Sequence, residues 1–106
     1  MKYDRKDDVL NYFVNQLRNQ LGSHLKKVVL FGSRSRGDDV PGSDYDCLVV
    51  VDVVSEEIKD VIDEVAGDAL FHHNAVFSAF LISKGKFQRK TYNPLLMNIN
   101  KEGVVL

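Results

Sequence analysis

The chain has 106 residues and a mass of 12.0 kDa, which is the size of one small domain. Its 44% hydrophobic and 27% charged residues are typical of a globular protein and exclude a disordered tail or a collagen-like repeat. The single cysteine, Cys47, excludes an intramolecular disulfide and favours a reducing compartment. The 14 Lys and Arg nearly balance the 15 Asp and Glu, so the basic excess of a protein that clamps duplex nucleic acid is absent.

The sequence also argues against export and membrane insertion. No apolar run reaches the roughly 18 residues that a membrane span requires. The polar first residues, Met1 to Asp8, do not resemble a secretion signal. Neither a repeat nor a Pro/Gly/Ser-rich linker divides the chain. We therefore expect one cytoplasmic domain over residues 1–106, with no membrane or duplex nucleic-acid partner.

The first half of the chain predicts a helix followed by a buried strand. The helix is expected from about Asp4 to Leu21, where Gly22 and Ser23 end it. The run Leu25 to Phe31 is short and apolar, as in a strand buried on both faces. The helix has one apolar face, formed by Leu10, Phe13, Val14, Leu17 and Leu21.

The second half predicts two more strands and two more helices. Strands are expected over Tyr45–Val54 and about Ala75–Ile82, and Ser55 is the expected N-cap of the helix between them. Asn93-Pro94 and Gly103 are typical of the start and end of a last helix. This order predicts an α+β (mixed α/β) fold, a small mixed sheet flanked by helices. The face of the middle helix is formed by Ile58, Val61, Ile62, Val65 and Ala69.

The polar segment after Phe31 has the residue types of a phosphate-binding turn. Gly32 allows close approach of the backbone to a ligand, and the following N–H groups can attract phosphate. Ser33 adds a hydroxyl donor, and Arg36 adds a guanidinium suited to phosphate oxygens, with Arg34 a less certain contact. The segment is not a P-loop, because no Gly-Lys-Ser/Thr closes it.

Two acids follow at the start of the next strand, in Ser43-Asp44-Tyr45-Asp46. Side chains alternate along a strand, so Asp44 and Asp46 should share one face and Tyr45 the other. Magnesium prefers one or two carboxylates together with substrate phosphates and water. The pattern therefore predicts a magnesium site beside the phosphate-binding turn, suited to in-line displacement at phosphorus.

Gly32-Ser33, Arg36-Gly37 and Ser43-Asp44-Tyr45-Asp46 together resemble the signature of polymerase-β-type nucleotidyltransferases. Within that superfamily, the chain is most similar to the minimal, MntA-type nucleotidyltransferase proteins, over most of its length. The resemblance implies a polymerase-β-type nucleotidyltransferase fold. It assigns Gly32, Ser33 and Arg36 to nucleotide binding, and Asp44 and Asp46 to catalysis and magnesium binding.

The resemblance further implies transfer of AMP from ATP to a hydroxyl. Minimal members are typically antitoxins that adenylylate a tyrosine of a HEPN-type ribonuclease toxin, so such a toxin is the expected partner. Many members have a third acid on a later strand, but residues 75–82 contain none. Asp68 is the nearest acid and would need an unusual loop to reach the site.

Two alternative functions stay open. A binding-only antitoxin of the same fold is favoured by the missing third acid. A small-molecule nucleotidyltransferase usually has an additional acceptor domain, for which this chain has no room. Other polar residues are weaker candidates: Cys47 is expected in the core, His72 and His73 in a loop, and the acidic 55–68 and basic 84–90 stretches either in solvent or at a partner.

Overall fold

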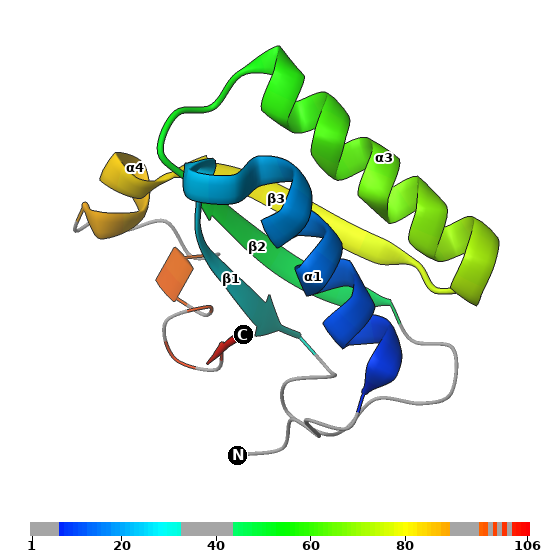
Figure 1. Ribbon diagram of the computed structural model, residues 1–106. Helices are drawn as coiled ribbons and strands as arrows, with labels where there is room; N and C mark the ends of the chain where they lie inside the picture. Colours follow the sequence, from blue (N-terminus) through cyan, green and yellow to red (C-terminus); the bar gives the residue numbers. More distant parts are fainter. Residues whose placement is uncertain (1–6, 33–43, 90–95, 98, 100, 102) are drawn as a thin grey trace.

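A computed structural model describes residues 7–32, 44–89, 96, 97, 99, 101 and 103–106. It contains both helices and strands, as the sequence predicts for an α+β protein (Figure 1). In chain order they are α1 (Asp8–Leu21), the short 3-10 helix η1 (Gly22–His24), β1 (Leu25–Phe31), β2 (Tyr45–Val51), α3 (Glu56–His73), β3 (Phe77–Ser83), α4 (Lys84–Gln88) and β4 (Val104–Val105).

The strands form one mixed sheet in the order β3-β2-β1-β4. β1 pairs antiparallel with both β2 and β4, whereas β2 and β3 are parallel and are connected through α3. The register places Phe31 of β1 opposite Asp46 of β2, and Ser78 of β3 beside the same aspartate. The sequence prediction of a small mixed sheet with flanking helices is confirmed.

Helices α1 and α3 cover one face of the sheet (Figure 1). Alternate residues of β2 point into this layer, where Cys47, Val49 and Val51 are fully buried. Phe13 of α1 is also fully buried and stacks on Phe77 of β3, with ring centroids 3.9 Å apart. Burying these side chains is the main contribution of this face to stability.

The opposite face of the sheet has a smaller apolar cluster. Leu48 and Val50 of β2 are buried there with Val29 of β1, under Leu96 and Ile99. Residues 96, 97, 99 and 101 are helical, and the N–H of Gly103 donates to the Ile99 carbonyl at 2.7 Å. The predicted end of the last helix at Gly103 agrees with that bond, whereas its predicted start at Asn93-Pro94 lies outside the described residues.

Several predicted boundaries are wrong by a few residues. α1 begins at Asp8, not Asp4, because the Asp7 side chain caps it by accepting a hydrogen bond from the Leu10 N–H at 2.9 Å. β2 ends at Val51, and the next residues, through Val54, are exposed. β3 begins two residues later than predicted and extends to Ser83. β1 and the Ser55 N-cap are confirmed.

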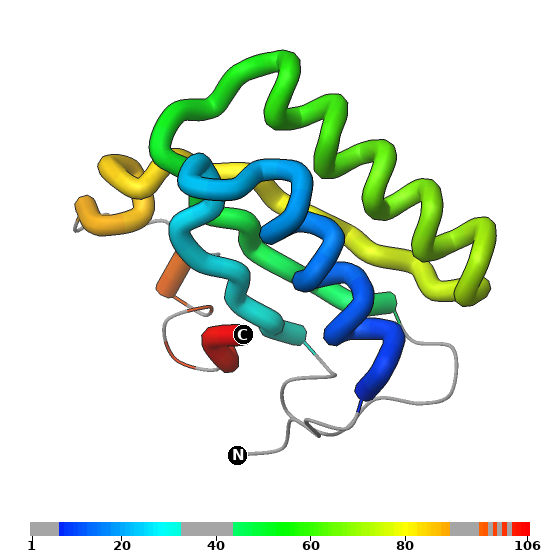
Figure 2. The backbone as a smooth tube through the Cα atoms, in the orientation of Figure 1, coloured from blue at the N-terminus to red at the C-terminus, as the bar shows by residue number. Residues whose placement is uncertain are grey.

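One end of the molecule collects several chain segments that are distant in sequence. The start of β2 and the end of β1 lie there, close to the start of α1 and the end of α3 (Figure 2). The parallel crossover through α3 places the start of β3 at the same end. Among the described residues, no helix is long and apolar enough to cross a membrane.

Candidate functional site

The candidate site lies where β1 ends and β2 begins. Asp46 is the second residue of β2, and its register partner Phe31 is the last residue of β1. Gly32 follows Phe31 directly, so the chain leaves the sheet beside the Asp46 carboxylate. This end of the sheet therefore brings together Gly32, the first residue of the predicted phosphate-binding turn, and Asp46, one of the two predicted acids.

Gly32 has a conformation and a position that both favour glycine. Its φ of 76° lies in the left-handed region, where a side chain is strained. A Cβ at this position would overlap Oδ2 of Asp46. The Gly32 backbone therefore lies close to the Asp46 carboxylate, an arrangement in which a phosphate and a cation could be held together.

Asp46 lies on the face of β2 that points away from the helical layer, because it alternates with the buried Tyr45 and Cys47. Asp44 is exposed just before β2, and Asp46 is half-buried on the face of Leu48. Tyr45, between them, is buried on the opposite face under α1. The carboxylates of Asp44 and Asp46 are hard oxygen ligands of the kind that magnesium takes, and phosphate and water would complete its shell.

Tyr45 fixes the start of β2 by contacts that the sequence did not reveal. Its hydroxyl donates to Oδ2 of Asp7 at 2.7 Å, while Oδ1 of the same aspartate caps α1. Its ring stacks on Phe77 at a centroid distance of 4.5 Å, and Phe77 stacks in turn on Phe13. The stack of Tyr45, Phe77 and Phe13 connects β2, β3 and α1, and so holds the backbone that presents the two acids.

β3 provides no acid beside these carboxylates. Its residue in register with Asp46 is Ser78, which is half-buried. No group of three or more His, Cys, Asp or Glu in the described part of the chain could hold a metal. Asp68 belongs to α3, in the layer on the other face of the sheet, so the structure gives it no route to Asp46.

The remaining candidates are placed as follows. Ser33, Arg34 and Arg36 lie outside the described residues. Cys47 is in the core as expected, and burial together with the neighbouring Asp46 charge raises the pKa of its thiol to about 12, which makes it unreactive at neutral pH. His72 and His73 were expected in a loop but form the exposed last turn of α3.

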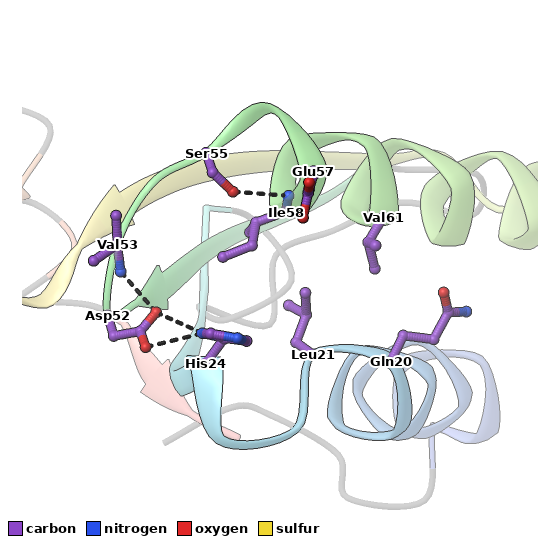
Figure 3. A pocket seen from close by; sticks show the side chains of 9 residues that line it. All are labelled: Gln20, Leu21, His24, Asp52, Val53, Ser55, Glu57, Ile58 and Val61. Atoms are coloured by element: carbon purple, nitrogen blue, oxygen red, sulfur yellow. Dashed lines mark hydrogen bonds and ion pairs between the residues drawn. The ribbon is translucent and has the colours of Figure 1, made fainter.

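A hollow of about 340 Å³ lies at the other end of β2 (Figure 3). Asp52, the residue after β2, accepts a hydrogen bond there from Nδ1 of His24 at 2.9 Å, and this bond lowers the pKa of Asp52. Asp52 is six positions after Asp46 along an extended strand, a distance of about 20 Å. The hollow is thus separate from the candidate site.

Three comparisons with known proteins bear on this geometry. The chain matches the nucleotidyltransferase domain family over residues 10–95. It is 32% identical over 101 residues to the "Putative protein adenylyltransferase MJ0604" of Methanocaldococcus jannaschii, covering 95% of this chain and 97% of that protein. A second protein of that organism, "Putative protein adenylyltransferase MJ1305", is 26% identical over 88% of this chain and 65% of its own length.

Solved structures of similar fold are distant in sequence. A toxin-antitoxin structure with AMP-PNP is 18% identical with a TM-score of 0.61, over 88% of this chain and 68% of that one. A complex of a tri-AMPylated HEPN toxin of Shewanella oneidensis with an MNT antitoxin has a chain that is 18% identical with a TM-score of 0.59, over 92% of this chain and 67% of its own length. These likenesses support the fold.

The family match over most of the chain, together with the 32% identical relative, is decisive: the chain belongs to the nucleotidyltransferase domain family. The family resemblance inferred from Gly32-Ser33, Arg36-Gly37 and Ser43-Asp44-Tyr45-Asp46 is thereby confirmed.

Proposed function

We propose that the protein transfers AMP from ATP to a hydroxyl of a partner protein, with magnesium, and thereby acts as an antitoxin. The observation that carries the proposal is the closeness of the Gly32 backbone to the Asp46 carboxylate, in a chain of the nucleotidyltransferase family. The protein acceptor is supported by the relatives named as protein adenylyltransferases.

In the proposed reaction, the hydroxyl oxygen forms a bond to the α-phosphorus of ATP. The bond from this phosphorus to the β-phosphate oxygen breaks, and pyrophosphate leaves. Asp44 and Asp46 would hold magnesium, which supplies charge neutralisation for the phosphates when bound. Gly32, Ser33 and Arg36 would bind the triphosphate, and the proton of the hydroxyl passes to water.

The proposed partner is a HEPN-type toxin, and the proposed acceptor is a tyrosine on it. This is supported by structures of similar fold, one of which is a complex of a tri-AMPylated HEPN toxin with an MNT antitoxin. The test is co-expression with the product of the neighbouring reading frame, followed by size-exclusion chromatography. Co-elution is expected, and a chain that elutes alone would contradict the partner.

The transfer itself is tested with labelled ATP, magnesium and the co-purified partner, by mass spectrometry for AMP on the partner. We expect Asp44→Asn/Asp46→Asn to reduce transfer by about a thousandfold, because several kcal/mol of charge stabilisation is lost. Asp52→Asn is the matched control, since it makes the same change at the other end of β2. Transfer that survives in the double variant would refute the site.

A second candidate is a binding-only antitoxin, and Ser78 favours it. This serine stands beside Asp46 where a third carboxylate could complete a two-metal site. If the wild-type chain neutralises its partner without transferring AMP, Ser78→Asp tests the reason. Appearance of transfer in this variant, and its absence in Ser78→Asn, would assign the inactivity to the missing acid.

A further inference from the structure

Two phenylalanines lie on the sheet face that carries Asp46. Phe31 is the cross-strand partner of Asp46, and Phe80 lies on β3 two residues after Ser78. Their ring centroids are 5.9 Å apart with an interplanar angle of 45°, so the two rings meet across β2. They form one aromatic surface next to the candidate site, which we name the Phe31–Phe80 pair.

Phe80 lies on β3, an edge strand of the sheet, and its ring is largely exposed. Its register neighbour Leu48 is 2% exposed under Leu96 and Ile99, whereas Phe80 is 44% exposed. Phe31 is half-buried and supports the Phe80 ring from the side. The apolar cluster on this face therefore leaves one aromatic ring open to solvent close to the acids.

We propose that the Phe31–Phe80 pair is the platform on which the base of the bound nucleotide stacks, with Phe80 as the contacting ring. The inference rests on the proposed function, because it takes the phosphates to lie at the Gly32 turn. Gly32 follows Phe31 directly, so a nucleotide held there by its phosphates has its base within reach of this surface. An aromatic side chain can stack on any base, because every base has a π-face. The platform therefore contributes affinity for the nucleotide and only weak selectivity among bases.

The first test separates the base from the phosphates. Calorimetry measures binding of magnesium–ATP and of magnesium–tripolyphosphate, which has no base, to the full chain. Phe80→Leu keeps an apolar side chain but removes the π-face, and we expect it to weaken ATP binding about tenfold and leave tripolyphosphate binding unchanged. Phe71→Leu is the matched control on α3, since Phe71 is 84% exposed and belongs to the layer on the other face.

A second test reports on stacking directly. The chain contains no tryptophan, so Phe80→Trp introduces a single indole at the proposed platform. ATP should quench its fluorescence more strongly than tripolyphosphate at equal occupancy, because only ATP brings a base against the ring. Equal quenching by both ligands would overturn the platform.

The outcomes also separate this inference from the proposed function. If the wild-type chain binds neither ligand, the phosphate site and the platform both fail. If the wild-type chain binds both ligands but Phe80→Leu binds ATP as tightly as wild type, only the platform fails. This holds even if the variant transfers AMP to the acceptor protein less efficiently. If Phe80→Leu weakens the binding of both ligands equally, Phe80 has a structural role and the proposal is overturned.

Discussion

The two faces of β2 are built from alternate residues of the same strand, yet they differ in composition and in how much of each face is packed against other elements. Cys47, Val49 and Val51 point into the layer under α1 and α3 and are fully buried. The other face begins with Asp46, and its apolar cover reaches only the later part of the strand. A short sheet can thus provide a stable core on one face and a polar site on the other. The packing of the core face fixes the strand backbone that carries the polar residues.

The largest expected effect comes from breaking the covered face. Phe13→Ala removes a fully buried ring that stacks on Phe77. We expect a loss of about 4 kcal/mol in the free energy of unfolding, because transfer and cavity terms add. Urea denaturation measures it. Tyr12→Ala, on the same helix but half-buried, is the control, and an equal loss there would contradict the central role of the stack.

Gly32→Ala tests the contact between the turn and Asp46. The left-handed φ alone should cost about 1–2 kcal/mol of stability, and the new methyl group must displace the Asp46 carboxylate. We therefore expect lower thermal stability together with weaker magnesium–ATP binding. Gly22→Ala has a similar positive φ but no neighbour within 4 Å, so it should lose stability only. Equal nucleotide affinity in the two variants would argue against the site.

Tyr45→Phe tests how the covered face positions the acids. It removes the hydroxyl that donates to Oδ2 of Asp7, at an expected cost of about 1.5 kcal/mol in unfolding free energy. Asp7→Ser keeps an N-cap for α1 but removes the same acceptor. In a double-mutant cycle the two changes should be less than additive. Full additivity would show that the hydroxyl and the carboxylate do not stabilise each other.

The smallest effect is expected at the far end of β2, where His24 and Asp52 pair in solvent. In the folded chain, the hydrogen bond from His24 lowers the pKa of Asp52 below the ordinary aspartate value of 3.8. The contribution of Asp52 to stability is therefore present above pH 3.8 and is lost as the pH falls through the lower pKa of the folded state. Asp52→Asn should therefore unfold at slightly lower denaturant concentration than wild type at pH 6. The difference should shrink with acidification below 3.8, and a difference that grows instead would reverse the assignment.

The boundaries that the sequence predicted well are those with a strong local signal. The continuous apolar run of β1 and the Ser55 cap of α3 required no tertiary information. β2 was predicted too long because Val53 and Val54 are apolar, whereas the chain turns away at Asp52, which contacts His24. α4 and β4 were missed since five and two residues are too few for periodicity.

The candidate site was predictable only in part, for a similar reason. Strand alternation correctly predicted that Asp46 and Tyr45 lie on opposite faces of β2. The contact of Asp7 with Tyr45 joins distant segments, and the position of Ser78 depends on the parallel register set by α3, so neither could be read locally. The same register determines that Phe80 lies near Asp46.

The pairing of β4 with β1 has a consequence for folding during synthesis. β1 is an inner strand only because Val104 and Val105 pair with it, and the Leu106 N–H donates to Val28 at 2.9 Å. These residues are translated long after β1. Until then, β1 is an unpaired edge strand with three consecutive apolar residues, Val28, Val29 and Leu30, which are buried in the folded chain. Lys26 and Lys27 directly precede this run, and charged residues beside an apolar strand disfavour its pairing with other chains.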